Sequence, residues 1–169
     1  MREVLEGRVW VFGDDISTDH IIAGKYLGTT DPKVFAAHAM ENVRPDWAKQ
    51  VQADDILVAG DNFGCGSSRE QAPLALRSLG ITAIVANSFA RIFYRNAINL
   101  ALPVVECRDL VKHVKEGETL SVDLTKGEVR TAAGQRFSTL PYPPHIVAIL
   151  RAGGLVPKLR AEIAGRPRL

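Results

Sequence analysis

The chain has 169 residues, of which 46% are hydrophobic and 24% charged, and its formal net charge is only +2. This length is sufficient for one domain with a full core, and the small net charge gives no argument for a nucleic-acid or membrane partner. The N-terminal sequence MREVLE has no apolar signal segment, no run approaches the ~18 apolar residues of a membrane span, and there are two cysteines, so we expect a cytoplasmic protein without disulfides.

The first half of the chain predicts an α/β arrangement. A strand is expected over residues 7–13, followed by a polar turn over 14–20 that holds three carboxylates. Pro32 in the first turn, with Asp31 as cap, predicts a helix over 33–40. From there, strands and helices alternate, which predicts a partly parallel sheet: strands over 54–59, 81–86 and 103–107, and helices over 71–79 and 89–100. Asn87 or Ser88 is expected to cap the second of these helices.

The second half changes character. Two alternating segments, 119–124 and 128–131, flank Lys126-Gly127, which predicts a β-hairpin. A short strand within 136–140 and helices over 145–152 and 155–163 follow. We therefore expect a single α/β domain over residues 1–169, in which a partly parallel body carries a short antiparallel appendage. Residues 1–6 and 165–169 are expected to fray.

The sequence GDNFGCGSSRE at residues 60–70 is the main candidate for a functional site. Its glycines allow a tight turn and a close approach to a bound group, and a strand–loop–helix junction presents backbone N–H groups to an anion. Ser67 and Ser68 are candidate N-caps, with Glu70 completing a capping box. A well-capped turn without ligand remains the alternative, but Arg69 favours carboxylate binding, because a guanidinium grips a carboxylate bidentately.

Other polar residues are weaker candidates. Asp19-His20 lies in the polar turn, and such a pair is too small for a zinc site. Arg91 and Arg95 share one face of a predicted helix, which is either solvated or anion-binding. Cys65 is expected to be a small buried residue.

Three segments together resemble the swivelling domain of the aconitase superfamily: STDHI at 17–21, GDNFGCGSSRE at 60–70 and SFARIFYRN at 88–96. The similarity is greatest to the small subunits of two-subunit hydro-lyases, namely 3-isopropylmalate dehydratase and homoaconitase. It spans nearly the whole chain, from about Gly7 to Leu155. The resemblance implies reversible loss and re-addition of water on a malate-like acid, a step of leucine biosynthesis or of a lysine-type pathway.

The resemblance also implies roles for individual residues. Ser67 would be the base that removes a proton next to a carboxylate. Ser68 and Arg69 would hold a substrate carboxylate, and Asp19, with His20 beside it, would assist proton movement. The loop residues Leu27, Gly28 and Thr29 would contact the group that differs between substrates. Gly28 carries no charge there, which favours isopropylmalate, and homoaconitate remains the alternative.

The family reaction uses a [4Fe–4S] cluster, which usually takes four ligands. Cys65 and Cys107 alone cannot hold one, so we expect this chain to bind no cofactor and the cluster to lie on a separate large subunit. An anion-binding module without catalysis is a competing hypothesis. An RNA-binding regulator is disfavoured, because no basic stripe with interleaved aromatic residues is present.

Overall fold

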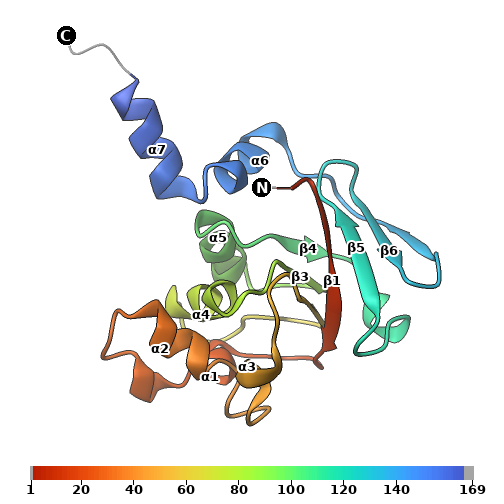
Figure 1. Ribbon diagram of the computed structural model, residues 1–169, viewed down its shortest axis with the longest axis horizontal. Helices are drawn as coiled ribbons and strands as arrows, with labels where there is room; N and C mark the ends of the chain where they lie inside the picture. The colour runs from red at the N-terminus through yellow and green to blue at the C-terminus, as the bar shows by residue number, and fades with distance from the viewer. Residues whose placement is uncertain (1, 166–169) are drawn as a thin grey trace.

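The structure, a computed structural model, describes residues 2–165 and is built on one seven-stranded sheet (Figure 1). The strand order is β4-β3-β2-β1-β5-β6-β7, with parallel pairing from β4 to β1 and antiparallel pairing from β1 to β7. This confirms the predicted α/β class with a partly parallel sheet. The strands are β1 (Val4–Val11), β2 (Ile56–Ala59), β3 (Ala83–Ala86), β4 (Val104–Glu106), β5 (Thr119–Asp123), β6 (Glu128–Thr131) and β7 (Arg136–Ser138).

Strand β1 joins the two halves of the sheet. Its residues 9–11 pair in parallel with β2, whereas residues 4–8 pair in antiparallel fashion with β5. The predicted appendage is therefore a continuation of the same sheet. The expectation that residues 4–6 fray was wrong, because Leu5 is buried opposite Val122 in this ladder. Residues 166–169 of the expected C-terminal fray lie outside the described residues.

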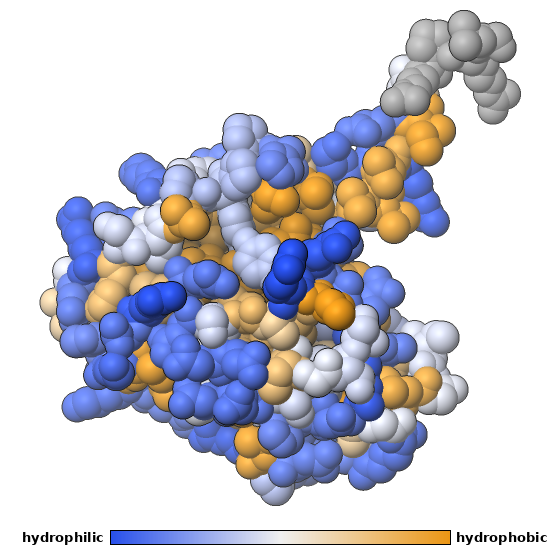
Figure 2. Space-filling view, turned by 180° about the vertical axis from the view of Figure 1, so that it is seen from behind, coloured by the Kyte–Doolittle hydropathy of each residue, from blue (hydrophilic) through white to orange (hydrophobic). Residues whose placement is uncertain are grey.

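The helices lie along and beside this sheet (Figure 1). Segment α7 extends away from the rest of the molecule and exposes Val156, Leu159 and Ile163, and Figure 2 shows hydrophobic side chains along it. No helix among residues 2–165 has the length and apolar character needed to cross a bilayer. The helices are α1 (Thr18–Ile21), η1 (Gly24–Tyr26), α2 (Pro32–Ala37), α3 (Trp47–Gln50), α4 (Gln71–Leu79), α5 (Arg91–Asn99), η2 (Leu110–Lys112), α6 (Pro144–Arg151) and α7 (Leu155–Ala164).

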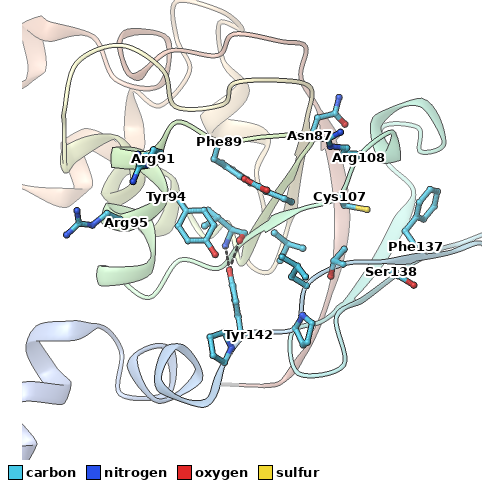
Figure 3. A pocket seen from close by; sticks show the side chains of 17 residues that line it. Asn87, Phe89, Arg91, Tyr94, Arg95, Cys107, Arg108, Phe137, Ser138 and Tyr142 are labelled. Carbon is cyan, nitrogen blue, oxygen red and sulfur yellow. Dashed lines mark hydrogen bonds between the residues drawn. The ribbon is translucent and has the colours of Figure 1, made fainter.

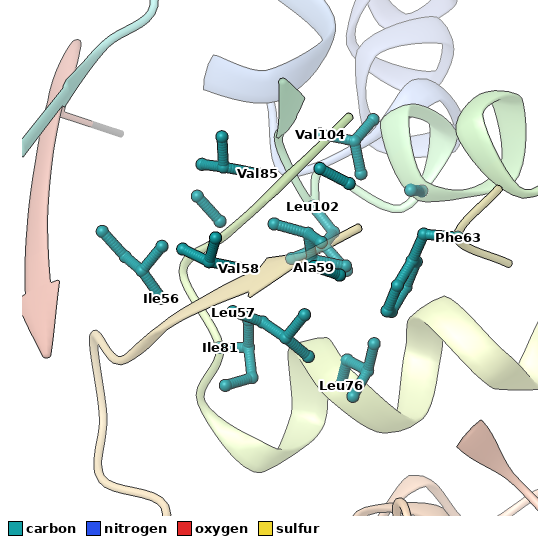
Figure 4. Close-up of a cluster of buried hydrophobic side chains, with 14 of the residues drawn as sticks. Ile56, Leu57, Val58, Ala59, Phe63, Leu76, Ile81, Val85, Leu102 and Val104 are labelled. Atoms are coloured by element: carbon teal, nitrogen blue, oxygen red, sulfur yellow. The ribbon is translucent and has the colours of Figure 1, made fainter. Parts of the chain in front are cut away.

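The core of the parallel half explains why its strands carry uninterrupted apolar runs. Every residue of β2 and β3 is buried, as expected for parallel strands covered on both faces. Figure 4 shows Leu57 of β2, Leu76 of α4 and Phe63 within one buried cluster. Burying a side chain of this size contributes about 1.5–3 kcal/mol, so this cluster fixes the positions of the loops that leave β2 and β3.

The caps at two helix starts differ from the prediction. Gly80 ends α4 and Asp31 caps α2, as expected. Helix α4 begins at Gln71, as predicted, but its N-cap is Glu70 without a side-chain hydrogen bond, so the predicted capping box of Ser67 and Glu70 was wrong. The caps predicted for α5 were also wrong, because Ala90 is the N-cap, while the Ser88 hydroxyl accepts from the Asn62 N–H at 2.8 Å.

The loops that follow the parallel strands meet at one edge of the sheet. The loop after β2 forms isolated bridges with the segment after β1, through Ser17 and Cys65, and with the segment after β3, through Phe63 and Phe89. Because the carboxyl ends of parallel strands point the same way, this edge brings together the three segments singled out in the sequence.

Candidate functional site

A cleft of about 460 Å³ lies at this edge, between the glycine loop and the start of α5. It brings Ser67 and Arg69 together with Arg91 and Arg95, so the predicted helix face turns toward the predicted loop. Its remaining lining residues come from α1, the loop and the first turn of α5: Thr18, Gly64, Gly66, Ala90, Ile92 and Phe93.

The backbone of the loop requires glycine at two positions. Gly64 has φ +80°, and a Cβ there would lie 2.2 Å from Cγ of Phe93. Gly66 has φ +92°, a conformation that other residues rarely adopt. The loop therefore passes directly over the Phe93 ring and turns back, which brings Ser67 to the mouth of the cleft.

The hydroxyls of Ser67 and Ser68 are exposed and have no hydrogen-bond partner among residues 2–165. The carbonyl of Ser67, in contrast, accepts a hydrogen bond from the Thr18 hydroxyl at 3.0 Å. The Thr18 N–H also donates to the Cys65 carbonyl at 2.8 Å. Because the buried Thr18 holds the loop backbone, the serine hydroxyls are not used as helix caps and are free to contact a ligand.

Arg69 is held in place by the segment after β1. Its side chain is 17% exposed and forms an ion pair with Asp19, and Nη1 also donates to the Ile22 carbonyl at 3.3 Å. Asp19 is 57% exposed and lies on the solvent side of this pair. The contacts use only Nη1, so Nε and Nη2 of Arg69 remain available to a carboxylate.

His20 is placed beside the cleft but does not line it. The Ser17 N–H donates to His20 Nδ1 at 3.1 Å, and the His20 N–H donates to the Ser17 hydroxyl at 3.2 Å. These two bonds form a capping box on α1, so the predicted polar turn over 14–20 contains a short helix. A neutral His20 accepts through Nδ1 and carries its hydrogen on Nε2.

The loop predicted to contact the variable group does not line the cleft. Leu27 and Thr29 are half-buried and Gly28 is exposed, and a Cβ added at position 28 would have no other atom within 4 Å. The preceding η1 turn is anchored through Glu41, whose carboxylate accepts from the Tyr26 hydroxyl at 2.8 Å and pairs with Lys25 at 2.7 Å. Hydrogen bonding to Lys25, and then to Tyr26 and His38, lowers the pKa of Glu41 to about 2.

The cleft carries uncompensated positive charge. Asp19 neutralises Arg69, whereas Arg91 and Arg95 form no ion pair among the described residues. Sequence reasoning left the role of these two arginines open and missed Thr18. The signals that could have found them were the spacing of the two arginines on one helix face and the place of all three residues in the segments 17–21 and 88–96.

The two cysteines occupy different environments. Cys65, expected to be buried, is only half-buried in the loop, because the loop lies at the mouth of the cleft. Cys107 is buried, and burial raises the pKa of its thiol to about 11, so it stays protonated. No group of three or more His, Cys, Asp or Glu side chains within residues 2–165 is arranged to hold a metal ion.

Comparisons of the sequence and of the fold with known proteins point to the same family. Residues 39–109 match the model of the aconitase C-terminal domain. The chain is 50% identical to the 3-isopropylmalate dehydratase small subunit 1 of Methanopyrus kandleri, over 96% of both chains. It is also 50% identical to the methanogen homoaconitase small subunit of Methanothermobacter thermautotrophicus, over 92% of this chain and 91% of that protein. The crystal structure of 3-isopropylmalate dehydratase from Methanocaldococcus jannaschii superposes with a TM-score of 0.89 at 42% identity, covering 95% of this chain and 96% of the other.

Proposed function

The chain belongs to the 3-isopropylmalate dehydratase small subunits of the aconitase superfamily, and we propose that with its large subunit it interconverts 2-isopropylmalate and 3-isopropylmalate. The reaction is a dehydration followed by rehydration on the neighbouring carbon, as a step of leucine biosynthesis. The observation that carries the proposal is the shared cleft, in which a free serine hydroxyl lies next to an oriented arginine. Since β1 belongs to both halves of the sheet, we propose that the chain acts as one domain.

Ser67 is the proposed base for the proton on the carbon next to a substrate carboxylate. A serine hydroxyl is a poor base unless its alkoxide is stabilised. The uncompensated positive charge of Arg91 and Arg95 in the same cleft favours that alkoxide. The fixed carbonyl of Ser67, bonded to Thr18, keeps the side chain at the mouth of the cleft.

Arg69 and Ser68 are the proposed carboxylate ligands. The free Nε and Nη2 of Arg69 can form a bidentate pair with one substrate carboxylate, and the Ser68 hydroxyl can donate a further hydrogen bond. Asp19 positions Arg69 through the ion pair and, exposed to solvent, is the proposed route for proton movement. His20, which follows Asp19 in the sequence and is exposed, is proposed to exchange protons with it.

The described residues of this chain do not fit the [4Fe–4S] cluster of the family reaction. Cys107 is a buried, protonated thiol, and Cys65 belongs to no group of ligands that could hold a metal ion within residues 2–165. We therefore propose that the large subunit carries the cluster and supplies the Lewis acid. Both cysteines are free thiols, which supports a reducing, cytoplasmic location for the chain.

Gly28 supports isopropylmalate as the substrate. A Cβ at position 28 would have no other atom within 4 Å, so this chain places no cation there for an additional carboxylate, and the nearby Lys25 is already paired with Glu41. Burying a carboxylate without a cation is unfavourable. The homoaconitase-named relative at 50% identity supports the second candidate, in which the tricarboxylate homoaconitate is the substrate.

The test is reconstitution with the large subunit, followed by parallel assays with 3-isopropylmalate and homoaconitate. Preferential turnover of isopropylmalate supports the proposal, and preference for homoaconitate selects the second candidate. Binding of dicarboxylates by the small subunit without turnover of either substrate in the complex would instead favour the anion-binding module.

A further inference from the structure

A second and larger groove, of about 1020 Å³, lies on the other side of the start of α5 (Figure 3). One wall is formed by β4 and the two residues that follow it, and the opposite wall by β7 and the connection from β7 to α6. Strands β4 and β7 are the two edges of the seven-stranded sheet, so the sheet curls enough to bring both edges to one groove.

The lining of this groove combines an apolar floor with a cationic rim. Phe89, Val104 and Val105 contribute apolar surface, and Leu140 stands at the lip with 89% of its surface exposed. The rim carries Arg91, Arg95 and Arg108, and none of these forms an ion pair within the part of the chain that the structure describes. Glu106 is the acidic residue of the lining, so positive charge predominates.

The outer edge of β4 is only partly satisfied. The Val104 N–H donates to the Tyr142 hydroxyl at 2.9 Å, and that hydroxyl donates to the Val104 carbonyl at 2.5 Å, so Tyr142 occupies the place of a neighbouring strand. Residues 103, 105 and 107 face β3, which leaves Glu106 facing the groove. In this parallel ladder the backbone N–H and carbonyl of Glu106 point away from β3, and they bond to no other segment within residues 2–165.

The groove is continuous with the catalytic cleft, because Arg91 and Arg95 line both. We propose that an extended, acidic segment of the large subunit docks in this groove, pairing with the β4 edge at Glu106 and with the rim arginines. The proposal rests on the proposed function in one respect: the large subunit that completes the catalytic cleft must also cover the adjoining groove. Unpaired backbone groups and an exposed leucine favour a polypeptide as the occupant.

Charge reversal at the rim tests the proposal with the full-length chain and the intact large subunit. Arg108 lines the groove but not the catalytic cleft, so Arg108→Glu should raise the Kd for the large subunit at least tenfold by biolayer interferometry. Turnover at saturating large subunit should stay within twofold of the unmodified complex. The matched control is Arg77→Glu, an exposed position on α4 outside both clefts, which should leave the Kd unchanged.

A second measurement does not depend on stability or on turnover. Leu140→benzoylphenylalanine should crosslink to the large subunit on irradiation, and Val43→benzoylphenylalanine, at a 40% exposed position outside both clefts, should not. Equal Kd values for the two arginine variants, together with no crosslink from position 140, would overturn the docking site. Both measurements are made without substrate, so they remain informative if the complex turns over neither isopropylmalate nor homoaconitate.

Discussion

The Thr18 hydroxyl donates a hydrogen bond to the backbone carbonyl of Ser67 across 3.0 Å, which ties α1 to the glycine loop. Thr18 is buried, and its own N–H donates to the Cys65 carbonyl. Two hydrogen bonds from one residue therefore fix the loop on both sides of Gly66. The proposed base thus owes its position to a residue outside the glycine loop.

Replacing Thr18 by valine should lower turnover without a comparable change in KM. The variant keeps the side-chain shape but leaves the Ser67 carbonyl without its donor, which costs about 1–3 kcal/mol. We expect kcat of the reconstituted complex to fall about tenfold and the melting temperature of the small subunit to fall by several degrees. The control, Thr30→Val at an exposed position, should change neither; an unchanged kcat for Thr18→Val would contradict the positioning role.

Ser67→Ala should remove most of the activity and leave stability unchanged. A general base contributes typically ~10²–10⁴ in rate. The structure removes the stability cost expected for a helix cap, because Glu70, not Ser67, is the N-cap of α4. Turnover and the melting curve are measured side by side with Ser78→Ala, an exposed serine on α4. A loss of activity below roughly threefold would argue against Ser67 as the base.

The sequence predicted the strands of the parallel half well, because β2 and β3 are buried on both faces and read as apolar, β-branched runs. The predicted helix caps failed. The Ser67 hydroxyl caps no helix, and the Ser67 carbonyl accepts a hydrogen bond from Thr18, 49 residues away in the sequence. The Ser88 hydroxyl accepts from the N–H of Asn62, 26 residues away. A local sequence pattern cannot reveal partners so distant in the sequence. The cleft could therefore be predicted only from the three motifs whose residues surround it.

Arg69→Lys should behave as a severe substitution. An ammonium group cannot maintain the contact with Asp19 and also form a bidentate pair with a carboxylate. Loss of one charge-assisted hydrogen bond costs about 2 kcal/mol, which corresponds to a roughly thirtyfold lower kcat/KM. Arg77→Lys, on the exposed face of α4, is the matched control. Near-normal kinetics for Arg69→Lys would mean that the carboxylate is held elsewhere.

Gly28→Arg should shift substrate preference toward the tricarboxylate. Gly28 is exposed and offers no charge to a substrate group, whereas the introduced guanidinium would pair with the additional carboxylate of homoaconitate. The reconstituted enzymes are compared in a competition assay with both substrates. Gly24→Arg is a matched control, since its surroundings are equally open. If the unmodified enzyme already prefers homoaconitate, the assignment of isopropylmalate fails and the reaction class remains.

The stability that Glu41 contributes should be lost in acid. Because its pKa is lowered to about 2 by Lys25, Tyr26 and His38, its contribution is present above the ordinary value of 4.5 and is lost as the pH falls from there through about 2. We expect the melting temperature to drop more steeply between pH 5 and pH 3 in the unmodified chain than in Glu41→Gln. Glu6→Gln, at an exposed position in β1, should keep the steep drop. If the melting temperatures of the unmodified chain and of Glu41→Gln fall equally with pH, Glu41 does not stabilise the fold through its contacts with Lys25, Tyr26 and His38.

The divided pairing of β1 also has a consequence during protein synthesis. Residues 9–11 find their partner once β2 has left the ribosome, but Leu5 pairs with Val122, which is translated 117 residues later. At cellular elongation rates, this interval is on the order of ten seconds. Over that time residues 4–8 lack their partner strand, and the charged Glu6 and Arg8 interrupt the apolar residues of this segment. Such charges act as gatekeepers against premature association of nascent chains.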